Sequence, residues 1–147
     1  MEKLNDPNSE IYKKTIELQK KFISYRLKKI KNRYLDDKMG CVGTKEVIAS
    51  HLNKGPAQNL VLTFFTNKRT TCLQCGKSKG DIGIRQFERA HCNNYSRKDL
   101  LLLALDDLYV DETTPIITGD ILKRFIQKHE LCPIYILCNM CHNTYDN

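Results

Sequence analysis

The sequence has no long apolar run. Its longest strictly apolar stretch, residues 100–105, is six residues long, whereas a membrane-spanning helix needs about 20. The first 20 residues contain no apolar segment of the kind that a secretion signal carries. Acidic residues are also in short supply, with 17 Asp and Glu against 24 Lys and Arg. The lack of a long apolar run and of a secretion signal argues against an integral membrane or secreted protein. We expect an intracellular protein with no membrane partner.

The length and the cysteine content narrow the class further. A chain of 147 residues is the size of one ordinary domain. With 41% hydrophobic and 28% charged residues, its composition is that of a globular protein. Seven cysteines, an odd number, accompany the lack of a secretion signal. This combination favours metal-bound thiolates in a reducing compartment over a framework of disulfides.

The positive charge is concentrated near the N-terminus. Residues 9–35 hold nine Lys and Arg against two Glu, an excess of seven that equals the net charge of the whole chain, +7. Apolar residues recur there at helical spacing, so we predict one helix over residues 9–36 with a basic outer face. That face is either a solvated surface or a surface that contacts phosphates. Its candidate DNA-binding residues are Lys20, Lys21, Arg26, Lys28, Lys29, Lys31 and Arg33.

Elsewhere the apolar spacing predicts short helices and strands. Residues 57–66 are compatible with a helix or with a buried strand, because short apolar runs do not separate the two by periodicity. A helix there would form a helix-turn-helix with a preceding helix over 44–53. The other expected elements are a strand that ends at His91, a helix over 96–109 capped by Ser96, a helix over 118–129 capped by Thr118, and a strand over 134–137.

Two Cys-x-x-Cys pairs predict a zinc site. Cys72 and Cys75 form the first pair, and Cys138 and Cys141 form the second after 62 intervening residues. Zn²⁺ takes four soft ligands in a tetrahedron, and each pair offers two thiolates from one tight turn. The two pairs together would form a Cys₄ site with no open position, which is a structural site. We assign no ligand role to the other cysteines and expect small buried thiols there: Cys41, Cys92 and Cys132.

Two of the four histidines lie next to these features. His91 ends a predicted strand, and His142 follows the last cysteine of the second pair directly. His51 and His129 have no such context, and we expect each to be a surface residue or a satisfied core residue. The arrangement Cys-x-x-Cys … Ala-His91 … Ile-Leu-Cys-x-x-Cys-His142 resembles the HNH endonuclease family, whose core is a ββα-metal finger. The resemblance covers residues 72–146.

The resemblance implies a role for each matching residue. His91 would be the general base that takes a proton from the attacking water, and His142 would bind one divalent cation, Mg²⁺ or Mn²⁺. Asp146, four residues later on the same helical face, would be a second cation ligand. Ala90 stands where many members of the family have Asp before the catalytic His. The family's middle Asn is missing from its usual place, and Asn93 or Asn94 would serve instead.

We therefore predict an α+β fold in which a Cys₄ zinc site holds a ββα-metal (HNH) core, with helices inserted between the two cysteine pairs. Residues 1–69 would form a helical basic region that contacts DNA, and residues 70–147 would form the nuclease core. The predicted function is a DNA endonuclease of restriction, mobile-element or viral type that leaves 5′-phosphate ends. Cutting both strands would favour a homodimer on double-stranded DNA. The alternatives are a non-catalytic zinc protein that binds nucleic acid and a zinc ribbon for protein interaction.

Overall fold

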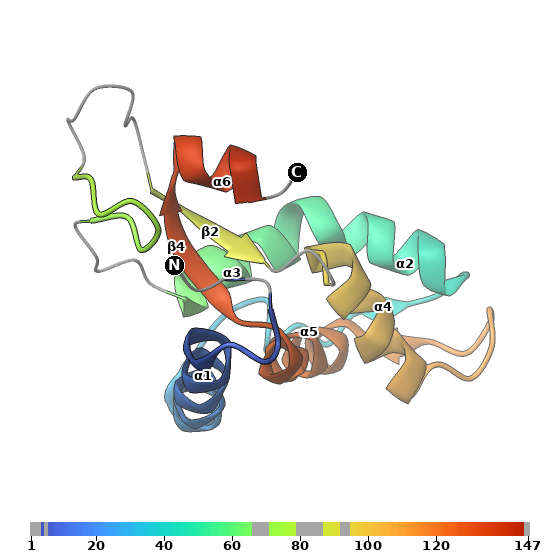
Figure 1. Cartoon of the computed structure of the whole chain (residues 1–147). Helices are drawn as coiled ribbons and strands as arrows, with labels where there is room; N and C mark the ends of the chain where they lie inside the picture. The colour runs from blue at the N-terminus through green and yellow to red at the C-terminus, as the bar shows by residue number, and fades with distance from the viewer. Residues whose placement is uncertain (1–3, 5, 66–70, 79–86, 92–94, 146–147) are drawn as a thin grey trace.

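The computed structural model describes residues 4, 6–65, 71–78, 87–91 and 95–145, with only the backbone at 87, 144 and 145. The fold is α+β. Its described residues form helices and two small antiparallel sheets, one of β1 (Gly40–Cys41) with β3 (Ile116–Ile117) and one of β2 (Phe87–His91) with β4 (Ile134–Cys138). Figure 1 shows the β2–β4 sheet with α6 next to it. No helix in the described part of the chain is long and apolar enough to cross a membrane. The elements in chain order are α1 (Glu10–Lys29), β1 (Gly40–Cys41), α2 (Lys45–Leu52), the π-helical turn η1 (Asn53–Ala57), α3 (Gln58–Phe64), β2 (Phe87–His91), α4 (Arg97–Leu108), β3 (Ile116–Ile117), α5 (Thr118–Lys128), the 3₁₀ turn η2 (His129–Leu131), β4 (Ile134–Cys138) and α6 (Asn139–Tyr145).

Helix α1 is shorter than predicted. Ser9 caps its start, since its side chain accepts a hydrogen bond from the N–H of Tyr12 at 3.3 Å. The helix ends at Lys29 rather than near residue 36, because Ile30 turns to an extended conformation. The side chain of Asn32 then accepts a hydrogen bond from the N–H of Tyr34 at 2.8 Å, which stabilises a turn in place of further helix.

The region after α2 is helical. Thr44 caps α2, which lies within the predicted range 44–53. Residues Gln58–Phe64 form a helix instead of a strand. The two helices are joined by the π-helical turn that contains Pro56, so the helical path continues and no helix-turn-helix forms. A π turn suits this position because proline lacks the N–H that regular α-helical bonding would use.

The inserted helices match their predicted positions. Ser96 and Asp99 form a reciprocal capping box at the start of α4. Helix α5 begins at Thr118, but the hydroxyl of Thr118 donates to the carbonyl of Met39 at 2.9 Å instead of capping the helix. That bond accompanies the unpredicted β1–β3 pairing. A side chain at Gly119 would clash with the carbonyl oxygen of Leu35, so glycine allows this close approach.

The second sheet determines where the functional residues lie. Strands β2 and β4 pair antiparallel, with Phe87 opposite Cys138 and His91 opposite Ile134. Helix α6 follows β4 directly. The strand ending at His91 and the strand near 134–137 are both as predicted.

The core consists of two clusters. The larger one joins α1, α2, α3, α4 and α5, and thus draws on both sides of residue 69. The smaller one lies around the β2–β4 sheet, where Ala90, Tyr135 and Leu137 are buried together with Leu4 and two of the paired cysteines. The hydroxyl of Tyr135 donates to the carbonyl of Leu4 at 2.8 Å, which holds the N-terminal segment against the sheet.

Candidate functional site

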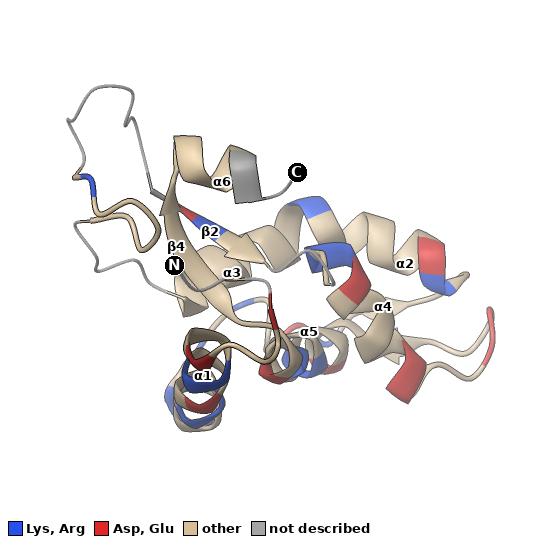
Figure 2. Cartoon of the chain, viewed as in Figure 1, with Lys and Arg blue, Asp and Glu red and all other residues tan. Residues whose placement is uncertain are grey.

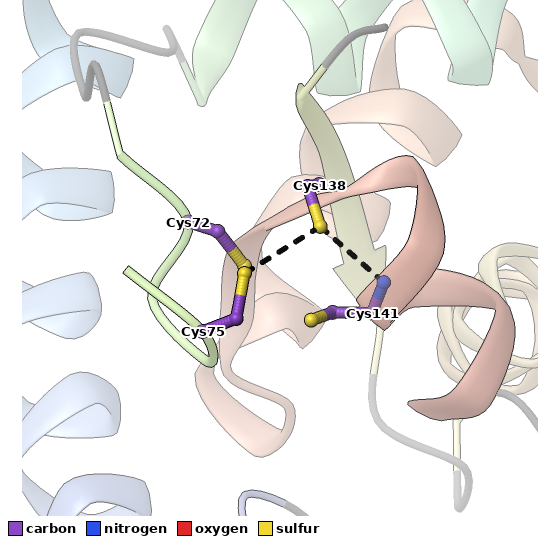
Figure 3. Close-up of side chains that lie close together, drawn as sticks. All are labelled: Cys72, Cys75, Cys138 and Cys141. Carbon is purple, nitrogen blue, oxygen red and sulfur yellow. Dashed lines mark hydrogen bonds between the residues drawn. The ribbon is translucent and has the colours of Figure 1, made fainter. Parts of the chain in front are cut away.

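Four cysteines gather at one end of the β2–β4 sheet. Cys72 and Cys75 lie on a turn in which the N–H of Gly76 donates to the carbonyl of Cys72 at 2.9 Å. Gly76 has φ +74°, a conformation that favours glycine. Cys138 ends β4 and Cys141 lies in α6. All four sulfur atoms lie within 4.8 Å of one another (Figure 3).

The geometry of the four cysteines fits a tetrahedral metal ion. Zn–S bonds of about 2.3 Å place sulfur atoms about 3.8 Å apart in a tetrahedron, and the Sγ atoms of Cys75 and Cys138 are 3.9 Å apart. The prediction that the two pairs come together is confirmed, and the tetrad could hold a metal ion such as zinc. Four thiolates would fill the coordination sphere, so this centre suits a structural role and leaves no position for a substrate.

Hydrogen bonding prepares one of these thiols for metal binding. Burial by itself would raise the pKa of Cys72, but hydrogen bonds with the backbone of Cys138, Cys75 and Gln74 lower it to about 7. Burial and the neighbouring thiols raise the pKa of Cys141 instead. Since a metal binds the thiolate form, loading the tetrad would release protons.

A cleft of about 390 Å³ lies beside the same sheet and helix. Its charged and polar lining comes from β2, α3, α4 and α6, elements that are far apart in the sequence. The described residues that line a larger hollow of about 490 Å³, next to α1 and α5, include no histidine or cysteine. The smaller cleft has two histidines and further charged and polar residues in its lining: Gln58, Glu88, Arg89, His91, Arg97 and His142.

Glu88 and His142 form one side of this cleft. The Nδ1 atom of His142 lies 3.5 Å from a carboxylate oxygen of Glu88. The sequence pattern points to His142 but not to Glu88, which reaches His142 because β2 lies against α6. Asp146, the predicted second ligand, lies outside the described residues, as do Asn93 and Asn94.

His91 is joined to a second histidine. Its Nε2 atom lies 3.2 Å from Nε2 of His129, whose Nδ1 atom is 3.0 Å from the carbonyl oxygen of Phe125. Burial, reinforced by neighbouring basic groups, lowers the pKa of His91 to about 3. Burial also lowers the pKa of His129 to about 4. Both imidazoles are therefore neutral at pH 7.

His129 is a core residue, as expected, but it also belongs to the site. Its contact with His91 spans 38 residues of sequence, and no local spacing signals it. His51 is exposed, which agrees with the expectation of a surface residue. Of the other thiols, Cys132 is buried and Cys41 is half-buried, whereas Cys92 lies outside the described residues.

Two arginines border the cleft. The Nε atom of one donates a hydrogen bond to a backbone carbonyl, and the Nε atom of the other donates to a side chain. Arg89 Nε donates to the carbonyl of Phe65, and Arg97 Nε donates to Oδ1 of Asn53 at 2.8 Å. A guanidinium has four further N–H donors at its end. These two side chains can therefore present fixed positive charge to an anion in the cleft.

The possible chemistry of the tetrad and the cleft is inferred from the positions and contacts of their residues. Comparisons of the chain with protein-family models, with curated proteins and with solved structures found no match. The tetrad is a closed set of thiolates, suited to stabilising the fold. The cleft combines a carboxylate, two imidazoles and two guanidinium groups, a set able to bind a cation, accept a proton and hold a phosphate.

The basic face of α1 lies apart from this cleft. Helix α1 packs near the start of β4, whereas α6 leaves the other end of that strand (Figures 1 and 2). Arg26 is half-buried and its guanidinium lies over the rings of Phe22 and Phe64, 5.4 Å from each centroid. The other candidate DNA-binding residues are exposed: Lys20, Lys21, Lys28, Lys29, Lys31 and Arg33.

Proposed function

We propose that this chain is a zinc-stabilised HNH-type DNA endonuclease that hydrolyses phosphodiester bonds in the cleft beside the β2–β4 sheet. The observation that carries the proposal is the convergence of His91 and His142 on one cleft next to the cysteine tetrad. The strand–strand–helix order of β2, β4 and α6 agrees with the ββα arrangement that the resemblance implies.

The donors on one side of the cleft fit a divalent cation. A carboxylate oxygen of Glu88 and an imidazole nitrogen of His142 lie 3.5 Å apart. The carboxylate suits Mg²⁺ and Mn²⁺ alike, whereas an imidazole nitrogen is a better ligand for a transition metal such as Mn²⁺. Glu88 and His142 would hold the ion, with Asp146 as the further ligand proposed from the sequence. When bound, such an ion neutralises charge on a phosphate and stabilises the leaving oxygen.

Three further residues would accept the proton and bind the phosphate. The neutral imidazole of His91 would accept a proton from the attacking water. Arg89 and Arg97, both fixed through Nε, would hold the phosphate oxygens and stabilise the charge that develops on them.

The exposed lysines of α1 would supply affinity for the duplex without reading its sequence. A contact surface apart from the cleft suits a substrate that is long, because one duplex can span both. Cutting both strands at one place calls for two active sites, so we propose a homodimer as the form that makes double-strand breaks.

Plasmid cleavage tests the proposal. Zinc-loaded protein is incubated with supercoiled plasmid in Mg²⁺, in Mn²⁺ and with no added divalent cation. We expect nicked and then linear DNA with 5′-phosphate ends in either cation and no cleavage without one. Plasmid that is bound and shifted on a gel but never cut would favour the alternative, a non-catalytic zinc protein that binds nucleic acid.

A further inference from the structure

His129 is a buried histidine that packs among aromatic rings and reaches toward the cleft. Its side chain is fully buried, and its ring lies 4.8 Å from that of Phe125 and 5.0 Å from that of Phe65, measured between centroids. A buried imidazole needs partners for both nitrogens. Here the partners are the carbonyl of Phe125 and the ring of His91.

We propose that His129 is a positioning residue that fixes the tautomer of His91, so that Nδ1 of His91 is the atom that accepts the proton. This inference rests on the role proposed for His91 above. It concerns which atom acts and what holds it in place.

The assignment follows from counting donors and acceptors. A carbonyl oxygen only accepts, so Nδ1 of His129 must carry the hydrogen in its contact with Phe125. A neutral imidazole has one N–H, so Nε2 of His129 is an acceptor. Its partner at 3.2 Å, Nε2 of His91, must then be the donor. With its hydrogen on Nε2, His91 carries a lone pair on Nδ1.

The backbone around His129 is held as firmly as its ring. The buried amide of Gln19 in α1 donates to the carbonyls of His129 and Cys132, each at 2.7 Å, and accepts from the N–H of Ile134 at 2.8 Å. Ile134 is the residue opposite His91 in the sheet. One amide therefore connects the segment that carries His129 to the strand position that faces His91.

This arrangement also serves the charged state of His91. As the oxygen of the attacking water bonds to phosphorus, its proton moves to Nδ1 of His91 and the bond from phosphorus to the leaving oxygen breaks. The leaving oxygen keeps the electron pair of that bond and takes a proton from solvent. The resulting imidazolium carries two N–H groups. Burial disfavours this charge, and the hydrogen bond from Nε2 to the lone pair of His129 offsets part of that penalty because it becomes charge-assisted. His91 afterwards returns the proton to solvent.

Two substitutions separate positioning from packing. His129→Phe keeps a ring of similar size but removes the acceptor, and His129→Gln places an amide oxygen where Nε2 stood. Nitrogen-15 NMR of the imidazoles in the zinc-loaded protein reports the tautomer of His91. We expect Nε2–H in wild type and in His129→Gln, and a mixture of tautomers in His129→Phe.

Cleavage under single-turnover conditions provides the second measurement. Removing a residue that orients a functional side chain typically costs about 10–100-fold, so we expect that loss in His129→Phe and substantial recovery in His129→Gln. Both variants lose the native packing of the imidazole, so a purely structural role would lower both rates alike.

The outcomes distinguish the two proposals. An Nδ1–H tautomer of His91 in wild type overturns the role of His129, and this spectrum needs no variant to fold. A His129→Phe protein that cleaves at the wild-type rate also overturns that role while leaving the nuclease function intact. Wild-type protein that cleaves no DNA, whatever the tautomer, overturns the proposed function itself.

Discussion

The cysteine tetrad and the cleft beside it both take residues from α6 but are built in different ways. The tetrad consists of two local turns, each with two ligands three residues apart, and the sheet only brings the turns together. The polar side chains that line the cleft come from four elements, and the pairing register of the sheet sets the positions of those on β2. The comparison shows that local spacing reveals a site made of turns, whereas a site made by packing becomes visible only in the fold.

The largest expected effect concerns the tetrad. Cys138→Ser removes a buried ligand at the junction of β4 and α6. A structural zinc contributes roughly 10–16 kcal/mol of apparent binding energy to folding, so the variant should lose the metal and unfold the β2–β4–α6 region. Metal analysis and circular dichroism measure both losses.

Cys41→Ser is the matched control. Cys41 lies outside the tetrad, and its sulfur contacts the hydroxyl of Thr118 at 3.1 Å, a hydrogen bond that serine preserves. This variant should keep one zinc per chain and a native spectrum. A Cys138→Ser protein that is equally folded without zinc would show that the tetrad does not hold the fold together.

The second effect concerns the cation ligands of the cleft. His142→Ala should lower cleavage by about 100-fold or more, because it removes a proposed ligand while the four thiolates remain. Cleavage rates against Mn²⁺ concentration provide the measurement, and excess Mn²⁺ should restore part of the activity. His51→Ala, at an exposed histidine, is the control and should match wild type. Loss of zinc in His142→Ala would mean that the two sites are not separate.

A smaller effect tests the packing that positions the cleft. Gln19→Leu leaves two carbonyls and one N–H without their buried partner. An unsatisfied buried polar group costs about 1–3 kcal/mol, with partial relief by water. We expect the free energy of unfolding to fall by about 2–4 kcal/mol in urea denaturation.

The exposed Gln127 of α5 supplies the control for this change. Gln127→Leu should alter the free energy of unfolding by no more than about 0.5 kcal/mol. Zinc content should be normal in both variants, because Gln19 contacts His129, Cys132 and Ile134 and none of the four cysteines of the tetrad. An unchanged stability in Gln19→Leu would show that its amide does not hold the His129 segment.

The smallest effect lies outside both sites. Replacing Lys28, Lys29 and Lys31 by Glu should weaken DNA binding equally for all sequences, and lower the slope of log affinity against log salt concentration by about three. Fluorescence anisotropy at several salt concentrations measures both. The control replaces three exposed lysines elsewhere, with the same change of net charge: Lys38, Lys54 and Lys123. Equal losses of DNA affinity in the two triple variants would show that the basic face of α1 is an ordinary solvated surface.

Much of the secondary structure follows from local signals. Ser9, Thr44 and Ser96 cap their helices through their own side chains, and strand β4 is a short apolar run. The predicted end of α1, near residue 36, lies beyond the observed end at Lys29. Ile30 and Tyr34 continue the apolar spacing, but the side chain of Asn32 stabilises a turn there. Apolar spacing alone therefore does not locate the end of this helix. A two-residue pairing such as β1–β3 has no sequence pattern at all.

The missed site residues share one physical feature. Glu88, His129 and Gln19 act on partners distant in the sequence, across a strand–helix contact, a ring pair and a buried amide. An isolated Gln within an amphipathic helix looks like a surface residue, although this one is 7% exposed. Only the packing of α1 against the segment before β4 shows its role.

The most direct test of the central claim compares wild type with His91→Ala in single-turnover cleavage of plasmid DNA with Mg²⁺. His91 borders the cleft and is not part of the tetrad, so the variant should keep its zinc, its fold and its DNA affinity. Loss of a general base lowers the rate by about 10²–10⁴-fold, and we expect a loss in that range. A His91→Ala protein that cuts DNA as fast as wild type would contradict the assignment of the cleft as the active site of an endonuclease.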